Sequence, residues 1–597
     1  MGNIYKEGIG RETLHLPLLD IYIGENNIAR AIDVFVESLD MVELKFTNSN
    51  LTVKDGAPAY HPKLLLKIYI YSYMYKIRSS RNIEREIGRN VELIWLTQGL
   101  VPKFKTIANF RKDNSEPLQQ VFKDFVQLIK TIDLIGGELA VVDGAYLRAN
   151  ASKNQTIVKK GVEQNLQKVD NNIDKYLLSL ETADEAEIKY LKLQKDIEEL
   201  KSKKDKSKED QQKLNKSVLE LKNREKESNK KHIELKKDIE KLNNKKDKSK
   251  EEQEKLQKSV LELKNREDEA KKKIEELNDK KELLNKDLEL LEEKNKNQYN
   301  KTDPDASIMV KPAHNLVAYN TQIAVDAKYK FIIETYVSTN GNDKQELHKM
   351  GSKVQEVLDK KEINLAGDTG YNSAKEIKKC IEDEIKPYVP APKAKNRDDE
   401  KGKFTKSQFT YDKENDSYIC PNEQHVKKTT SVQNQNEKLN YIYRTSTATC
   451  KDCPLKNRCL PKNSNHKTIY RWEHEEIIEQ HTKDMQTDEA KEILKKRGSI
   501  VEHPFGTIKR NLGWDHYLVR GKEKVSGENA LIMFGYNFKR LLNLIGIVLL
   551  MKLIINGKSE ELIEEIAKYI ANSWQIFLFF IFKDFNYNYY KNNLYYL

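Results

Sequence analysis

The feature that most constrains how this chain can fold is a long segment of heptad-spaced leucines, from about residue 160 to residue 300. The stretch KDKSKEDQQKLNKSVLELKNRE begins at Lys204 and returns almost unchanged at Lys246, a period of 42 residues or six heptads. Leucines recur at multiples of seven positions between Leu193 and Leu291, with further apolar residues four positions later. This pattern predicts a coiled coil inserted between segments of different composition.

The length of the segment indicates that it folds back on itself. One straight helix over residues 190–292 would span about 150 Å and would hold the flanking segments far apart. The polar KDKSKE stretches are the natural positions for turns, so we expect antiparallel arms. Whether the arms pair within one chain or between two stays open.

The flanking segments differ in their periodicity. Residues 1–135 carry apolar residues at helical spacing, which predicts an all-α N-terminal domain. Short β-branched runs, in contrast, predict strands at 138–143, 145–149, 317–326, 331–339, 363–368 and 386–392. A helix is expected over Asp343–Asp359, with Asp343 as its cap. Read without the coil and a polar stretch at 393–470, this is the element order of an α/β, RNase H-like core.

Charge and apolar content limit the partners of the chain. A net charge of +12 favours a polyanion such as nucleic acid. Five cysteines in 597 residues do not make a disulfide framework. The apolar runs Leu541–Ile555 and Trp574–Phe582 are shorter than the roughly 20 residues of a membrane helix, so we expect a buried helix and a docking tail. Without a signal peptide, these features predict a cytoplasmic protein with no membrane association.

Three acidic residues have the setting of a metal site. Asp143 and Asp368 each follow a predicted strand and precede a turn, where an α/β sheet presents its ligands, and Glu502 lies in a predicted helix. Converging carboxylates repel unless cations neutralise them, and two Mg²⁺ ions would serve phosphodiester chemistry. With 93 acidic residues in the chain, the alternative is that each is an ordinary surface or turn residue.

The surroundings of Glu502 favour the metal site. Glu502 and Lys509 are seven residues apart, two helical turns, so a metal-binding carboxylate and a phosphate-binding lysine would share one face. Pro504 between them predicts a kink or a helix start. The alternative is an ordinary surface helix.

Two further groups of residues have more than one interpretation. Cys420, Cys450, Cys453 and Cys459 are spaced either for one structural Zn²⁺ ion or as reduced, unliganded thiols, and Cys380 is expected to be buried. Arg78, Arg81, Arg85 and Arg89, near Tyr71, Tyr73 and Tyr75, fit either a DNA-facing helical surface or a solvated one.

Motifs along the whole chain resemble those of the DDE transposases of bacterial insertion sequences, in a branch with a helical insertion after the first aspartate. The motifs occur in the family's order: GAPAYHP (56–62), SSRNIE (79–84), TIANFR (106–111), VVDGAYLRANAS (141–152), TDPDASIM (302–309), AGDTGYNS (366–373), IVEHPFGTIKRNLGW (500–514), RGKEKV (520–525) and YNFKR (536–540). Leu494 stands where relatives often carry an aromatic residue, and the coil is longer than the family leads one to expect.

The resemblance implies an RNase H-like core, two Mg²⁺ ions for which Mn²⁺ can substitute, and double-stranded DNA as partner. It makes Asp143, Asp368 and Glu502 the catalytic, metal-binding triad and places Arg497, Lys509 and Arg510 beside the DNA. Terminal inverted repeats and target DNA would be the substrates, a homodimer would hold two ends, and the protein would be associated with the nucleoid.

The expected domains follow from these motifs. They are a DNA-binding and dimerisation domain (1–135), three parts of the catalytic core (136–159, 301–395 and 471–555), the coil (160–300), a cysteine-containing insertion (396–470) and a tail (556–597). Alternatives are an inactive, domesticated relative that only binds DNA, an RNase H-like nuclease without strand transfer, and a structural coiled-coil protein.

Overall fold

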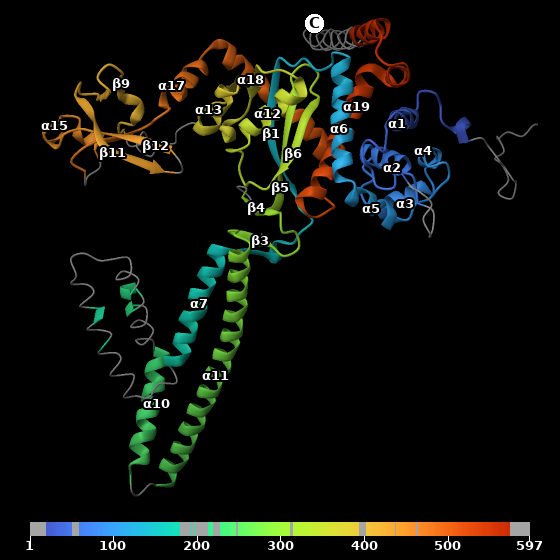
Figure 1. Cartoon of the computed structure of the whole chain (residues 1–597). Coiled ribbons are helices and arrows are strands. Elements are labelled where there is room, and N and C mark those ends of the chain that lie inside the picture. Colours follow the sequence, from blue (N-terminus) through green and yellow to red (C-terminus); the bar gives the residue numbers. More distant parts are fainter. Residues whose placement is uncertain are drawn as a thin grey trace, which may run out of the picture. The chain divides into compact units, whose positions relative to one another are not determined.

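A computed structural model of the chain describes residues 19–50, 59–178, 227–245, 249–310, 315–392, 402–435, 438–460 and 464–572, with isolated residues between 192 and 218 (Figure 1). The chain divides into two compact units, Met1–Ala151 with Asp305–Leu597, and Ser152–Pro304. The tail expected to dock at Trp574–Phe582 lies outside the described residues. No helix in the described part of the chain is long and apolar enough to cross a membrane.

The first unit is built on a mixed six-stranded sheet. Its strands are β1 (Leu139–Arg148), β4 (Ser307–Val310), β5 (Asn315–Asp326), β6 (Ile332–Ser338), β7 (Ile363–Ala366) and β8 (Ile385–Tyr388). Their order is β4-β5-β1-β7-β8, with β6 also paired to β5. β1 runs antiparallel to β5 and parallel to β7, and β7 runs parallel to β8. Antiparallel strands therefore come first and parallel strands follow, as the predicted element order requires.

The prediction of a separate strand at Ala145–Ala149 is wrong. β1 continues through Asp143 and Gly144 to Arg148, and it pairs with β5 along that whole length. The Asp-Gly dipeptide suggested a turn. Because β5 supplies hydrogen-bonding partners on both sides of the dipeptide, the chain stays extended there.

The expected cap of the first core helix is also wrong. α12 (Leu347–Leu358) begins four residues after Asp343, and Glu346 occupies its N-cap position without a side-chain cap. The carboxylate of Asp343 instead accepts hydrogen bonds from Asn320 and Gln322 on β5. Asp343 therefore belongs to the face of the sheet and not to the helix.

The N-terminal domain is helical, as predicted, and packs on one long helix of the core. Its helices are α1 (Ile28–Glu37), α2 (Pro62–Met74), α3 (Ser80–Ile87), α4 (Val91–Leu96), α5 (Phe104–Asp113) and α6 (Ser115–Thr131). The long helix, α19 (Lys522–Asn556), places Phe534 5.2 Å from the ring of Phe35 and 4.7 Å from that of Phe125. The buried Arg111 and Glu528 form an ion pair of 3.1 Å across the same contact. Phe534 of α19 thus packs against the N-terminal helices. The buried helix expected at Leu541–Ile555 is found only in part, because the backbone of Gly546 is not helical and Val548 and Ile555 are exposed.

The polar stretch before residue 470 forms a small sheet that the sequence did not indicate. Five antiparallel strands lie in the order β13-β12-β11-β10-β9. They are β9 (Thr410–Asp412), β10 (Ser417–Ile419), β11 (His425–Gln435), β12 (Lys438–Arg444) and β13 (Thr468–Trp472). Phe409, Tyr418, Val426 and Tyr443 form its apolar core. The next helices are α17 (Glu475–Asp484) and α18 (Asp488–Gly506), so the small sheet leads directly into the helix that carries Glu502.

The second unit is a helical hairpin on a two-stranded base (Figure 1). β2 (Thr156–Val158) pairs with β3 (Gln298–Asn300), and the described helices are α7 (Lys159–Leu178), α10 (Glu227–Asn243) and α11 (Lys250–Glu293). Leu284, Leu288 and Leu291 pack with residues at the start of α7. α10 ends and α11 begins around the second KDKSKE stretch, with Ser249 capping α11 in a capping box, so the chain turns there as predicted. That the arms form a coiled coil stays a prediction.

Candidate active site

The register between β1 and β7 places the two aspartates of the predicted triad next to each other. Val141 pairs with Ala366, where the parallel ladder ends. Asp143 lies two residues beyond Val141, and Asp368 lies two residues beyond Ala366. Asp143 is therefore inside β1 and not at its end. It lies just beyond the last residue of β1 that pairs with β7, so no strand covers that edge of β1 at Asp143.

Burial and charge together change the acidity of Asp143. Burial raises its pKa, and repulsion by the carboxylate of Asp368 raises it further, to about 6. Attraction by Arg497 and a hydrogen bond of 3.0 Å from the backbone N–H of Gly144 act in the opposite direction. Asp143 therefore lies close to Asp368 and to Arg497 of α18, two of the residues expected to surround it.

A tight turn fixes the second aspartate. Asp368 caps the 3₁₀ turn Thr369–Tyr371, and its Oδ1 accepts a hydrogen bond of 2.8 Å from the N–H of Gly370. A Cβ atom on Gly370 would lie 2.9 Å from that oxygen. Any side chain at position 370 would therefore displace the carboxylate, which explains a glycine at this position.

A fourth carboxylate, which the sequence did not reveal, belongs to the same group. The Oδ1 atom of Asp343 accepts hydrogen bonds of 2.8 Å from Asn320 and 2.6 Å from Gln322. The Oε1 atom of Gln322 accepts a hydrogen bond of 2.5 Å from the hydroxyl of the buried Tyr371. Burial raises the pKa of Asp343, its hydrogen bonds from Asn320 and Gln322 lower it, and Asp368 raises it. Asn320 and Gln322 are themselves fully buried on β5. Because buried amides need hydrogen-bond partners, these two residues in an otherwise apolar strand were the signal in the sequence that a polar residue packs against them.

Glu502 faces the same cavity as Asp143. A cavity of about 640 Å³ is lined by Asp143, Asp343 and Glu502, together with Lys509 and Arg510. Asp368 is not among its lining residues. The Oε1 atom of Glu502 lies 3.4 Å from where a Cβ atom would sit on Gly498, one turn earlier in α18, so its carboxylate leans along its own helix.

The helix widens directly after Glu502. Pro504 lies inside α18, and Thr507–Asn511 form one turn of π-helix. Proline supplies no N–H for the helix ladder, and π-turns are rare features that often occur at functional sites. Lys509 and Arg510 lie in this wide turn and still reach the cavity, with Lys509 Nζ 5.4 Å from the ring of Phe505. The kink predicted from Pro504 is thus a change of helix type.

The chemistry of this site suits hard cations, since all its acidic ligands are carboxylates. Among the described residues, however, no three His, Cys, Asp or Glu side chains stand close enough together to hold one metal ion. Asp143 and Asp368 are neighbours, and Glu502 lines the same cavity as Asp143. Binding of one metal ion by all three would require their carboxylates to come closer together.

The four cysteines of the small sheet lie near one another. Burial raises the pKa of the Cys459 thiol, and the nearby thiols of Cys450, Cys420 and Cys453 raise it further. Cys450 Sγ donates a hydrogen bond of 3.0 Å to the hydroxyl of Thr445. Cys380 is fully buried in α13 (Ala374–Glu382), as expected.

The N-terminal arginines have different surroundings. Arg78 donates hydrogen bonds to the carbonyls of Gly513 and His516 and lies 4.6 Å from the ring of Trp514, so it joins the N-terminal domain to the core. Arg81 and Arg85 on α3 are exposed. Tyr71 and Tyr73, which were expected beside them, are buried, so they do not share a surface with these arginines.

Two family models match the chain. Residues 18–113 match a model described as "Transposase domain (DUF772)", and residues 419–542 match one described as "Transposase DDE domain". The second match includes β11, β12 and β13 of the small sheet, Glu502 and the first part of α19, whereas Asp143 and Asp368 lie outside it. No curated protein and no solved structure matches the chain.

These matches account for the general features of the molecule. A DDE domain implies an RNase H-like core and the use of divalent metal ions, and the mixed sheet agrees with that core. Transposase domains imply an enzyme that binds DNA and cleaves nucleic acid. The two matched segments, residues 18–113 and 419–542, thus support an insertion-sequence DDE transposase.

Proposed function

We propose that this transposase cuts the ends of its element and joins them to target DNA, with Asp143, Asp368 and Glu502 as its catalytic carboxylates. The register of β1 and β7 carries the proposal, because it brings two acids together where only cations would stabilise them. Glu502, which lines the same cavity as Asp143, is the third acid. Two Mg²⁺ or Mn²⁺ ions bound by these residues would polarise the phosphodiester and promote ionisation of the attacking water.

The residues of the cavity would then act on DNA in two reactions. In the first, water attacks phosphorus at the element end, the P–O3′ bond breaks, and a 3′-hydroxyl and a 5′-phosphate result. In the second, that 3′-hydroxyl attacks a phosphorus of target DNA, and the target strand leaves with its own 3′-hydroxyl. Lys509, Arg510 and Arg497 would hold the phosphates in place by charge.

The remaining domains would serve the two DNA ends. The exposed Arg81 and Arg85 on α3 support binding of the terminal inverted repeats by the N-terminal domain. Joining needs two ends in one complex, so we propose a homodimer in which the coil contributes to pairing.

The decisive test is Mg²⁺-dependent nicking and joining of DNA that carries the element's own ends, comparing the natural protein with Asp368→Asn. Asparagine keeps an oxygen to accept the Gly370 N–H and loses only the charge, so the turn should survive. We expect nicked and joined products from the natural protein and a loss of at least about 100-fold in the variant. Glu382→Gln, an exposed acid on α13, is the matched control.

Each departure has its own meaning. Equal cleavage by Asp368→Asn would remove Asp368 from the site. Nicked DNA without joined product would identify a nuclease, and binding without cleavage in both Mg²⁺ and Mn²⁺ would identify an inactive relative.

For the cysteines we propose one structural Zn²⁺ ion. The mutual effect of the four thiols on Cys459 supports it, and their present separation requires closer approach on binding. Purified protein should contain one zinc per chain, and Cys453→Ser should lower that content and the melting temperature. A metal-free protein whose melting temperature a chelator does not change would show that the thiols are unliganded.

A further inference from the structure

The segment that contains the small sheet has a large net positive charge for its length. Residues 402–472 contain thirteen Lys and Arg residues and six Asp and Glu residues, a net charge of +7 out of the +12 of the whole chain. These residues are about an eighth of the sequence. None of the arginines and lysines assigned above to DNA binding lies among them.

The strand register places two of these cations directly opposite each other. Lys427 on β11 pairs with Arg444 on β12, and both side chains are exposed. Directly opposed like charges destabilise an antiparallel pair. Within the described part of the chain, neither side chain has an ion pair or a hydrogen bond that would offset this repulsion.

The next residue, Lys428, does have an acidic partner in this sheet. Lys428 points to the other face, where its Nζ lies 2.8 Å from a carboxylate oxygen of Asp416 and 3.9 Å from the ring centroid of Tyr441. That pairing lowers the pKa of Asp416 to about 2. The sheet therefore neutralises the lysine on its inner face and leaves the outer pair, Lys427 and Arg444, without a counter-charge.

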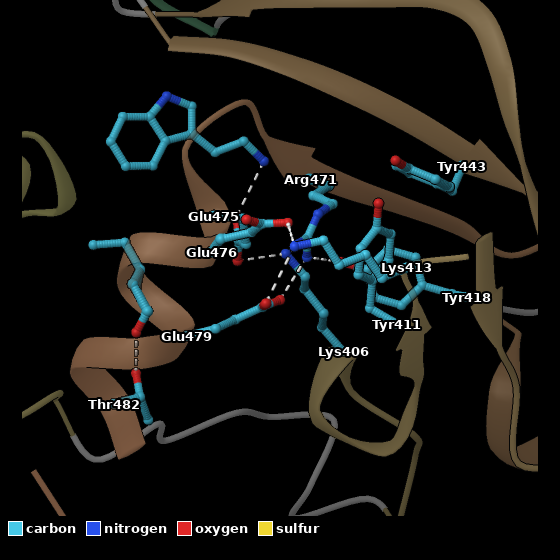
Figure 2. A network of polar contacts seen from close by, with 12 residues as sticks. Lys406, Tyr411, Lys413, Tyr418, Tyr443, Arg471, Glu475, Glu476, Glu479 and Thr482 are labelled. Atoms are coloured by element: carbon cyan, nitrogen blue, oxygen red, sulfur yellow. Dashed lines mark hydrogen bonds and ion pairs between the residues drawn. The ribbon is translucent and has the colours of Figure 1, made fainter. Parts of the chain in front are cut away.

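The inner face is closed by a network with α17. Figure 2 shows Arg471 between Glu479 of α17 and the rings of Tyr411 and Tyr418. Lys406 contacts Glu475 in the same network at 2.7 Å. On this face the cations Lys406 and Arg471 are therefore paired with acids of α17.

The outer face has the composition of a surface for a polyanion. Thr468 pairs with Arg444, and Tyr470, two residues further along β13, lies diagonal to Arg444 on the same face and is 47% exposed. The acid on this face, Asp412, lies at the far strand and accepts hydrogen bonds from Asn415 and the N–H of Glu414. An anion bridging the two cations would remove their repulsion, and a flat ring beside them suits packing against a sugar.

We infer that the outer face around Lys427, Arg444 and Tyr470 binds the DNA backbone, in addition to the DNA contacts at the cavity. The inference rests on the proposed function, since it assigns a second contact to the same substrate. The contact is to phosphates, so it acts on any sequence and strengthens binding as the salt concentration falls.

The test measures the affinity of the full chain for a 30-base-pair duplex of arbitrary sequence, in metal-free buffer, across a series of salt concentrations. Losing two phosphate contacts should reduce the slope of log K against log salt by about 1.8 in Lys427→Ala/Arg444→Ala. The same variant should melt at or above the temperature of the natural protein, because the opposed charges are gone. Lys558→Ala/Lys568→Ala, exposed and distant in sequence, is the matched control and should keep the natural slope.

The outcomes separate this inference from the proposed function. An unchanged slope in Lys427→Ala/Arg444→Ala would overturn the inference even where the natural protein nicks and joins DNA. A reduced slope with no cleavage by the natural protein would support the DNA-binding face and contradict the catalytic proposal. An equal loss in the control variant would mean that net charge alone sets affinity, and would also overturn the inference.

Discussion

At the scale of single residues, the structure places one carboxylate that the sequence did not predict, Asp343, in the candidate site. It lies four residues before α12 begins, in no motif, and its role follows only from the two buried amides of β5 that hold one of its oxygens. Its other oxygen, Oδ2, would be 3.5 Å from a Cβ atom on Gly370, the glycine that also contacts Asp368. Asp343 therefore adds a negative charge beside Asp143 and Asp368.

Replacing Asp343 by asparagine tests this placement. In a chelator, we expect Asp343→Asn to melt about 1–3 °C higher than the natural protein, because one of several repelling charges is gone. The rise in melting temperature produced by Mg²⁺ should be smaller in the variant, because the ion binds less tightly to a site with fewer negative charges. Asp359→Asn, at an exposed left-handed position that asparagine also adopts, should behave like the natural protein. A lower melting temperature for Asp343→Asn would mean that Asp343 is a structural hydrogen-bond acceptor only.

Asp143 gives the metal-free protein a characteristic pH dependence. With its pKa raised to about 6 in the folded state, the folded protein takes up a proton before the unfolded chain does. Ionised Asp143 therefore lowers the free energy of unfolding fully above pH 6, and this loss of stability disappears as the pH falls toward 4. At pH 7 we expect Asp143→Asn to be about 2–3 kcal/mol more stable than the natural protein in urea unfolding, with the difference vanishing near pH 4. A difference that does not depend on pH would contradict the raised pKa.

At the scale of elements, the close contact between α19 and α6 sets the position of the N-terminal domain. A Cβ atom on Gly527 would lie 2.6 Å from the Cα atom of Ser115, a backbone atom that cannot rotate away. Gly527→Ala should therefore cost about 1–3 kcal/mol of stability through overpacking. Gly535→Ala, in the same helix with its nearest neighbour 3.9 Å away, should be neutral or stabilising. Equal urea midpoints for the two variants would show that the helices can separate without cost.

Elements with strong periodicity could be predicted, and elements that depend on distant partners could not. Apolar runs located the strands of the core except β4, and heptads located the helices of the second unit. The small sheet was not predicted because its strands are short or rich in polar residues, and only five buried apolar residues in the described part of the chain form its core. The motifs around Asp143 and Asp368 could be read from the sequence, whereas their adjacency depends on the pairing of Val141 with Ala366. The π-turn after Glu502 was only partly visible, since proline indicates a disturbance but not its form.

At the scale of the whole molecule, the second unit begins and ends on paired strands. Val158 pairs with Gln298, and the N–H of Lys159 donates to the carbonyl of Asn297 at 2.9 Å. Replacing Lys159–Asn297 by Asn-Gly should therefore close β2 and β3 as a two-residue hairpin. We expect this variant to fold, to keep the melting transition of the first unit, and to nick DNA, while losing joined product if the coil pairs two chains. Aggregation of the shortened chain would show that the helices are needed for folding.

The same base of paired strands has a consequence for the gene. Two nearly identical copies of a 22-residue stretch, 42 residues apart, lie between the strands, and nearly identical coding segments invite unequal crossing-over. Each such event would add or remove whole heptads, while Val158 and Gln298 at the two ends of the insertion stay paired. Copies of this element in one genome should thus differ in the number of repeats and agree in their catalytic sheets, so repeat number can serve as a record of descent among them.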